Sequence, residues 1–155
     1  MPQSLRSHSS VNKKGREVVI PPLLLMEPFT LSVPLAIPVS KKRQFRLNLN
    51  NYRNAHHMTL SKSKVEYAKA IAPLLKDCPK MPLGCSLTYT LFPPTQRVID
   101  ISNVCSIVDK YLSDTLTEQG IIPDDNYHFI TEINYRFGGI DKENPRVEVI
   151  IVPKI

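Results

Sequence analysis

The chain has 155 residues, 42% of them hydrophobic and 22% charged, which is ordinary for one globular domain with its own core. No run approaches the roughly 20 apolar residues of a membrane span, and three cysteines without a CxxC pair indicate reduced thiols in a cytoplasm rather than a zinc knuckle. The net charge of +6 is uneven: residues 1–55 carry nine Lys and Arg against two Glu, which indicates an anionic partner.

The front half is rich in proline and predicts irregular structure. Residues 1–27 are expected to form a basic, flexible extension, because their polar stretch has no periodicity, and the folded domain is expected over 28–155. Residues 29–40 alternate as a strand does, and Pro34 and Pro38 favour an edge position for it.

The middle of the chain predicts a helix and a strand. The helix begins at the cap residue Ser61 and fades near Pro73 or Lys76. Residues 77–84 read as a turn, and residues 85–93 alternate as a strand.

The last third predicts a second helix and two more strands. The helix runs from about Ser102 to Gln119 and stops at Gly120. Residues 127–138 and 145–154 form the strands, which we expect to pair as a hairpin. The element order predicts an α+β fold with a mixed sheet of about four to five strands covered by two main helices.

Residues 100–126 hold six acidic residues within this second helix and its flanks. On a helical wheel the apolar residues gather on one face, and Asn103, Lys110 and Asp114 form a second stripe. Asp109 lies apart from that stripe, at the other edge of the apolar face. The polar stripe is therefore ordered beside a core.

Paired carboxylates on a rigid scaffold suit Mg²⁺, which prefers oxygen ligands and a substrate phosphate. Asp100 precedes the helix and the Asp124–Asp125 pair follows it, so the two turns are candidates to converge on one site. The alternative is a solvated surface, on which Asp114 pairs with Lys110 and the Asp pair only forms a turn.

Several blocks together carry a resemblance. D-I-S-N at residues 100–103, Lys110 and Asp114 at a spacing of four, and GIIPDDN at residues 120–126 follow one another in order. Upstream lies LNLNNYRNAHH, rich in Asn with Tyr and Arg. This C-terminal part of the chain resembles the RusA-like family of Holliday-junction resolvases, which are small phage and prophage endonucleases.

The chain departs from the family pattern at two places. Ser102 stands where the family has a second Asp, and the interval from Asn103 to Lys110 is four residues longer than in short members. Because four residues make about one helical turn, the facing of Lys110 and Asp114 is kept. Either Asp109 or Asp114 then replaces the missing carboxylate. The candidate catalytic residues are Asp100, Asp109, Lys110, Asp114 and Asp125, and the candidate metal ligands are Asp100, Asp109, Asp114, Asp124 and Asp125.

The resemblance implies a Mg²⁺-dependent endodeoxyribonuclease, with Mn²⁺ as a substitute ion. It implies a homodimer that grips a four-way junction and nicks two strands symmetrically, in the cytoplasm of a bacterial host and away from membranes. Two rival readings are a DNA-binding protein of the same fold that lost the chemistry, and a small interaction protein whose basic arm binds an acidic protein. The candidate DNA contacts are Lys41, Lys42, Arg43, Arg46, Asn51, Tyr52, Arg53 and Arg97.

Overall fold

The computed structural model describes residues 9–11, 17–19 and 27–155. Two short strands near the N-terminus, β1 (Ser9–Val11) and β2 (Glu17–Val19), pair antiparallel with each other. The rest of the extension predicted over residues 1–27 lies almost wholly outside the described residues. Within the described ranges, no helix has the length and apolar character needed to cross a membrane.

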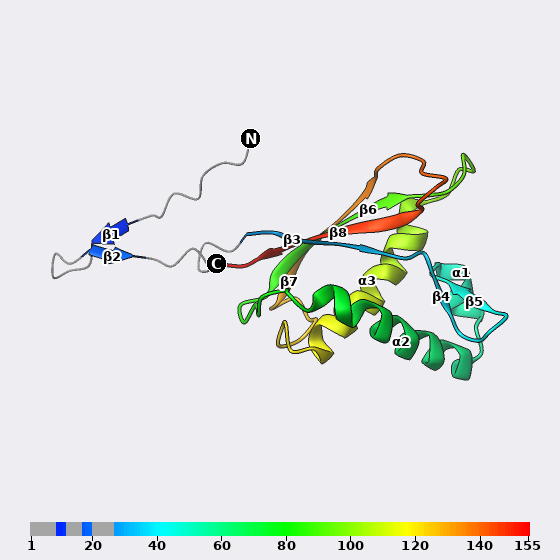
Figure 1. Ribbon diagram of the computed structural model, residues 1–155, viewed down its shortest axis with the longest axis horizontal. Coiled ribbons are helices and arrows are strands. Elements are labelled where there is room, and N and C mark those ends of the chain that lie inside the picture. The colour runs from blue at the N-terminus through cyan, green and yellow to red at the C-terminus, as the bar shows by residue number, and fades with distance from the viewer. Residues whose placement is uncertain (1–8, 12–16, 20–26) are drawn as a thin grey trace.

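The centre of the protein is a mixed sheet of four strands (Figure 1). Their order across the sheet is β3 (Phe29–Val33), β8 (Arg146–Pro153), β6 (Cys85–Phe92) and β7 (Ile130–Phe137). β8 is antiparallel to both of its neighbours, whereas β6 and β7 are parallel. The chain therefore crosses over between β6 and β7, as parallel neighbours require.

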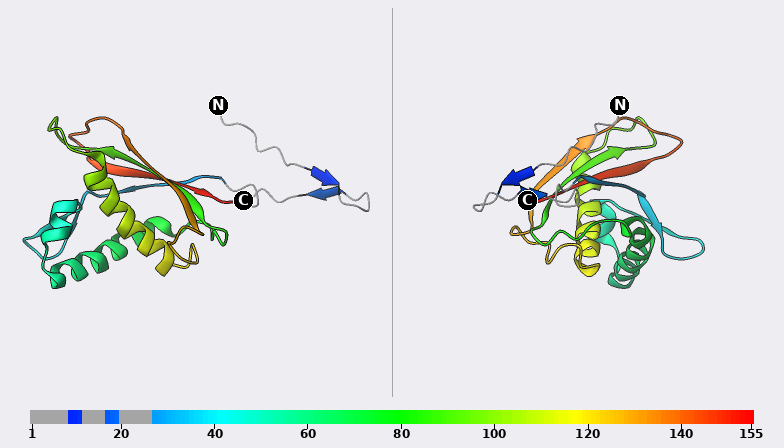
Figure 2. Two further views of the ribbon diagram at one scale, coloured as in Figure 1. Left: turned by 180° about the vertical axis from the view of Figure 1, so that it is seen from behind. Right: turned by 60° about the vertical axis from the view of Figure 1, so that its left-hand side comes forward.

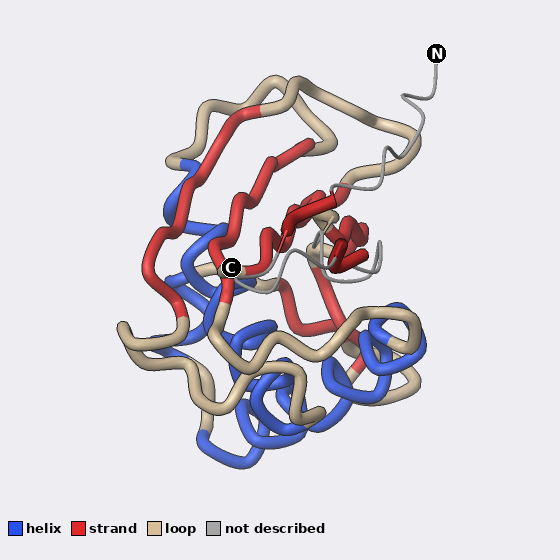
Figure 3. The backbone as a smooth tube through the Cα atoms, turned by 90° about the vertical axis from the view of Figure 1, so that its left-hand side faces the viewer, coloured by secondary structure: helices blue, strands red, loops and turns tan. Residues whose placement is uncertain are grey.

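That crossover is the long helix α3 (Ile101–Glu118), which packs on β6 and β7. Helix α2 (His57–Ile71), continued by the 3-10 turn η2 (Ala72–Leu75), packs beside α3. Seen end-on, the helices lie on one side of the strands (Figure 3), and Figure 2 shows the same layering from two further directions.

A smaller two-stranded sheet lies near the N-terminal end of α2. It is a hairpin of β4 (Ala36–Pro38) and β5 (Gln44–Arg46), followed by the short helix α1 (Leu49–Asn54). Ile37 and Phe45 form one of its cross-strand pairs, and both side chains are buried in the core. The hairpin is thus anchored by apolar residues while its tip, residues 40–43, is exposed.

The core fills the space between the sheet and the helices. Alternate residues of the two inner strands, β6 and β8, point into it, so these strands show a period of two. Tyr67 of α2, Tyr89 of β6 and Tyr111 of α3 are its largest fully buried side chains. Tyr111 donates or accepts a hydrogen bond of 2.7 Å with the buried hydroxyl of Ser63, which ties α3 to α2.

The predicted α+β class, with two main helices on a mixed sheet of four strands, is confirmed. The predicted edge position is confirmed for β3. The predicted strand does not continue to residue 40, because residues 36–38 form β4 and pair with β5 in the smaller sheet. The hairpin predicted for residues 127–138 and 145–154 is wrong, because β6 lies between β7 and β8. The predicted start at Ser61 is also late, since α2 begins at His57 with His56 as its cap.

Candidate functional site

Helix α3 places the acidic residues and also separates them. Asp100 is its exposed N-cap residue, and the Asp124–Asp125 pair follows its C-terminal end. The 18 residues between these turns extend about 27 Å. The predicted convergence of Asp100 with Asp125 therefore does not occur within one chain, because the rigid helix keeps the two turns at opposite ends.

Asp109 is the acid that the fold holds most firmly. Its carboxylate accepts a hydrogen bond of 2.7 Å from the hydroxyl of Tyr89 and one of 3.1 Å from the hydroxyl of Ser113. Tyr89 is fully buried in β6, so one donor comes from the sheet and the other from the next turn of α3. These two bonds fix the direction of the carboxylate at the edge of the core.

Asp114 and Asp125 share the electrostatic surroundings of Asp109. Burial raises the pKa of Asp109 above its ordinary value; the Tyr89 and Ser113 hydrogen bonds oppose this rise, and the negative charges of Asp125 and Asp114 add to it. Desolvation also raises the pKa of Asp125, helped by its contact with Asp124 and by the charge of Asp114. The charges of Asp109, Asp114 and Asp125 therefore act on one another and form an acidic group, in which Asp109 contacts Tyr89 of the sheet and Asp114 lines the same small cavity as Lys64 of α2.

Asp124 turns away from that group into its own loop. Its carboxylate accepts 2.8 Å hydrogen bonds from the backbone N–H of Asp125 and from the side-chain amide of Asn126. The backbone bond in particular lowers the pKa of Asp124, although the residue is exposed. Asp124 thus shapes the turn that carries Asp125, and its carboxylate is partly occupied by that role.

The donor set suits a hydrated cation more than a closed metal cage. In the part of the chain that the structure describes, no three His, Cys, Asp or Glu side chains lie close enough to hold a metal ion together. Mg²⁺, however, keeps several waters and commonly uses one or two carboxylates together with a substrate phosphate. The fixed carboxylate of Asp109 fits that mode of binding as one protein ligand, with Asp125 or Asp114 as the candidate second ligand.

The basic and aromatic residues meet on the other flank of α3. The ammonium groups of Lys110 and Lys64 lie 5.5 and 5.7 Å from the ring centre of Tyr52. Tyr52 itself packs edge-on against Tyr111, with the ring centroids 6.3 Å apart. Such distances allow cation–π attraction, so the Tyr52 ring of α1 lies between one positive charge from α2 and one from α3.

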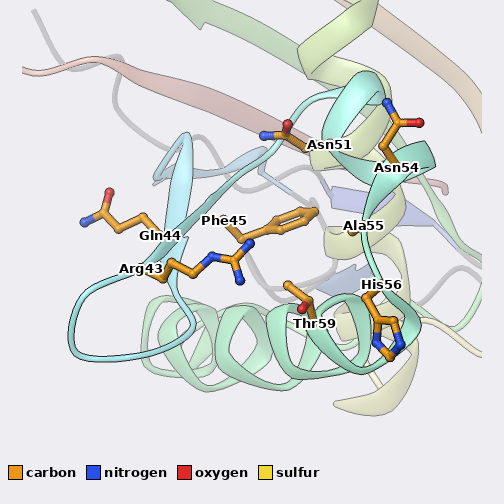
Figure 4. Close-up of a pocket in the computed structure, with 8 residues that line it drawn as sticks. All are labelled: Arg43, Gln44, Phe45, Asn51, Asn54, Ala55, His56 and Thr59. Carbon is orange, nitrogen blue, oxygen red and sulfur yellow. The ribbon is translucent and has the colours of Figure 1, made fainter.

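A cavity of about 370 Å³ opens between the β4–β5 hairpin, α1 and the start of α2 (Figure 4). Figure 4 shows the guanidinium of Arg43 pointing into it, just below the ring of Phe45 in that view. The Asn51 side chain donates a 3.1 Å hydrogen bond to the backbone carbonyl of Arg46, which ties α1 to β5. The lining residues are Arg43, Gln44, Phe45, Asn51, Asn54, Ala55, His56 and Thr59.

The remaining predicted contacts are spread around this cavity and beyond it. Lys41 and Lys42 are exposed at the hairpin tip, and Arg53 is exposed in the last turn of α1. Arg97 lies in the exposed segment that leads to α3. The structure therefore brings the hairpin and α1 candidates together, whereas Arg97 stands on a different segment near Asp100.

Sequence reasoning missed the residues that position the site. The strand pattern of residues 85–93 gives Tyr89 no role beyond the core, but its buried hydroxyl requires a partner and that partner is Asp109. Lys64 was overlooked because its ring partner, Tyr52, lies on another element. Asn103, one of the residues behind the family resemblance, accepts a 3.1 Å hydrogen bond from the backbone N–H of Leu49 and so anchors the first turn of α1.

The raised pKa of Asp109 predicts a pH-dependent stability difference. The folded protein binds the Asp109 proton more tightly than the unfolded chain, so stability falls as pH rises from 3.8 through the folded-state pKa. Asp109→Asn removes this titration. The free energy of unfolding of the variant, relative to that of the wild type, should therefore increase as pH rises through the same window. Urea unfolding in EDTA at several pH values checks this. A pH-independent difference would contradict it.

Comparison with known proteins adds no relative to this picture. A scan against protein-family models found no match to the chain, and a search of curated proteins also found none.

Proposed function

We propose that the protein is a Mg²⁺-dependent endodeoxyribonuclease of RusA-like type that acts on branched DNA as a homodimer and resolves four-way junctions. The observation that carries this proposal is the Asp109 carboxylate, held by Tyr89 and Ser113 beside Asp114 and Asp125. A fixed, partly desolvated carboxylate with further acids on and after the same helix supports metal-assisted phosphodiester hydrolysis. A purely solvated acidic surface would not need two hydroxyl donors to aim one of its members.

Each group has a part in the proposed reaction. Tyr89 and Ser113 orient Asp109, which would hold Mg²⁺ together with Asp125 or Asp114. An ion held there would supply polarisation of the phosphoryl oxygen and acidification of a water. A carboxylate of the group that does not hold the ion would accept a proton from the attacking water. Lys110, on the same helix, offsets charge that builds on the phosphate.

The DNA would lie along the basic flank. Arg43 and Arg46 on the hairpin, Arg53 on α1, Lys64 on α2 and Lys110 on α3 come from four elements that the fold gathers around Tyr52 and the cavity. Phosphate contacts of this kind give affinity without sequence preference. Tyr52 supplies an aromatic ring that a base at the branch point can stack on.

The deciding experiment is a cleavage assay on a synthetic four-way junction with a labelled strand in each arm. We expect paired nicks in symmetry-related strands with Mg²⁺ or Mn²⁺, and none with EDTA or Ca²⁺. Linear duplex of the same sequence serves as the substrate control. A protein that binds the junction but produces no nicks with either ion contradicts the nuclease proposal.

One specific observation favours a second candidate, a branched-DNA-binding protein that has lost catalysis. Ser102 is exposed in the first turn of α3 where the resembling family has an Asp, and no three acids of the described residues form a ready cage. The same assay separates the two candidates, because junction binding without cleavage is the expected result for the second.

Salt dependence tests the DNA surface independently of cleavage. If Arg43 contacts one phosphate, Arg43→Ala should lower the slope of log K against log salt concentration by about one. Lys76→Ala is the matched control, since Lys76 is exposed just after η2, at the opposite end of α2 from the hairpin. Fluorescence anisotropy across a salt series measures both. Equal slopes for Arg43→Ala and the wild type would remove the hairpin from the interface.

A further inference from the structure

Strand β7 forms an open edge of the main sheet. It is the last strand in the order, it has eight residues, and it contains neither proline nor glycine. Proteins usually protect such an edge with proline, lysine, bulges or a covering segment. The only irregularity here lies at the start of the strand, where the register with β6 shifts beside Thr131, so the six residues from Glu132 onward are regular.

The free hydrogen-bonding groups of β7 can be assigned from its pairing with β6. The backbone N–H of Gly138 donates to the carbonyl of Leu91 at 2.9 Å. Because backbone groups alternate along a strand, the even-numbered residues of β7 bond to β6. Ile133, Tyr135 and Phe137 therefore present their backbone N–H and C=O groups at the open edge.

The same three residues leave apolar surface uncovered. Ile133 and Phe137 are 43% and 60% exposed, although the neighbours opposite them on β6, Leu87 and Leu91, are fully buried. Helix α3 packs on both β6 and β7, yet it leaves these two side chains of β7 exposed. The uncovered apolar side chains and the free backbone groups thus belong to one continuous strip.

The charges on the opposite face of β7 form a self-complementary pattern. Glu132 and Arg136 stand two residues on either side of Asn134, and both are exposed. Among the described residues neither takes part in an ion pair. When two copies of β7 pair antiparallel about Asn134, Glu132 lies opposite the partner's Arg136, and Arg136 lies opposite the partner's Glu132.

The hydrogen-bond pattern fits this same register. Pairing about Asn134 matches Ile133 with the partner's Tyr135, so free backbone groups meet free backbone groups. The even-numbered residues become non-hydrogen-bonded pairs, in which side chains lie closest, which suits the two opposite-charge pairs. Moving the register by two residues in either direction keeps the backbone pairing but separates Glu132 from the partner's Arg136.

We propose that β7 is the dimerisation strand: two copies of the chain join edge to edge, antiparallel and centred on Asn134, into one continuous eight-stranded sheet. The two α3 helices then lie on the same face of that sheet and run antiparallel. In this dimer Val98, which precedes α3, lies at the same end of the β7–β7 pair as the partner's Tyr127, which precedes β7; both side chains are exposed in the single chain. This inference deepens the homodimer of the proposed function, but its tests use no nuclease activity.

Charge variants test the surface and its register. Sedimentation should give the wild type twice the 17.6 kDa of the chain. Glu132→Arg or Arg136→Glu alone places like charges opposite each other and should weaken the dimer at least about tenfold. The double swap restores complementarity and should recover most of the affinity. Glu66→Arg on α2 is the control and should dimerise normally.

Disulfide trapping tests the axis itself. With Asn134→Cys, the two Cα atoms across the axis lie about 4.5 Å apart, within reach of a disulfide, so oxidation should give a covalent dimer. With Glu132→Cys the two Cα atoms lie four residues apart along the strands, about 14 Å in all, and no cross-link should form. The native cysteines, Cys78, Cys85 and Cys105, are buried.

The outcomes separate this inference from the nuclease proposal. A monomeric wild type, a dimer insensitive to the single charge variants, a failed rescue by the swap, or equal cross-linking at both positions overturns the β7 dimer. Circular dichroism of each variant shows whether the monomer is folded, so a loss of dimer is not mistaken for unfolding. Junction cleavage by a wild type that dimerises through another surface would leave the nuclease proposal intact while this inference fails.

Discussion

Asp109→Asn is expected to reduce Mg²⁺-dependent junction cleavage by about a thousandfold, the upper end of what losing one preorganised electrostatic group costs. The amide oxygen can still accept hydrogen bonds from Tyr89 and Ser113, so the side chain keeps its place while its negative charge is lost. Junction affinity should stay unchanged, because the basic flank is untouched. Single-turnover cleavage and anisotropy with the same junction measure the two effects.

The matched control is Asp77→Asn. Asp77 is an exposed acid in the turn after η2, so the substitution removes the same charge outside the acidic group. It should leave both cleavage and binding as in the wild type. Cleavage by Asp109→Asn at more than a tenth of the wild-type rate would remove Asp109 from the chemistry and leave Asp114 and Asp125 as the remaining acids of the group.

Gly84→Ala should have the largest effect on stability, about 4 kcal/mol or more. Gly84 has φ of +93°, and a Cβ at this position would overlap the backbone carbonyl of Phe129. That carbonyl also accepts a 2.7 Å hydrogen bond from the N–H of Cys85, at the start of β6. The overlap therefore forces apart the segments that begin β6 and lead into β7. Chemical unfolding monitored by circular dichroism measures the loss.

Gly139→Ala is the control for backbone strain alone. Gly139 has φ of +119°, but nothing lies within 4 Å of a Cβ built there. Its cost should therefore be only the conformational penalty, about 1–2 kcal/mol. If the two alanine variants are equally stable, the close approach at Phe129 is not what requires glycine at position 84.

The sequence predicted the elements with strong periodicity and missed those defined by partners. Helix α3 begins one residue before its predicted start and ends one residue before its predicted end, because its apolar spacing and Gly120 mark it clearly. The short helix α1 has no buried residue and hence no apolar pattern to detect. The pairing of β7 with β6 could not be predicted either. The sequences of the consecutive strands β7 and β8 do not show whether the two strands are neighbours in the sheet or have another strand between them.

For the candidate site, too, the sequence predicted the residues that share a helix and missed the contacts made by distant partners. The helical wheel separated Asp109 from the stripe of Lys110 and Asp114, and the structure places Asp109 on the Tyr89 flank of α3 and Lys110 on the Tyr52 flank. The expected convergence of Asp100 and Asp125 is wrong because a helix of the length that the sequence itself predicts keeps these two residues at opposite ends. Which carboxylate is fixed depends on a hydroxyl from a distant strand, and no local pattern contains that information.

The weak attachment of α1 has a consequence for how DNA would be bound. None of the side chains of this six-residue helix is fully buried: Leu49 and Tyr52 pack only partly against the core, and single hydrogen bonds through Asn48, Asn51 and Asn103 hold the rest. Segments with so few buried contacts open at a small free-energy cost, so its amide hydrogens should exchange far faster than those of β6. Because α1 carries Tyr52 and Arg53, part of the gross binding energy goes into ordering it. Affinity for DNA is then set partly by local unfolding, and a substitution that only stiffens α1 should tighten binding without adding a contact.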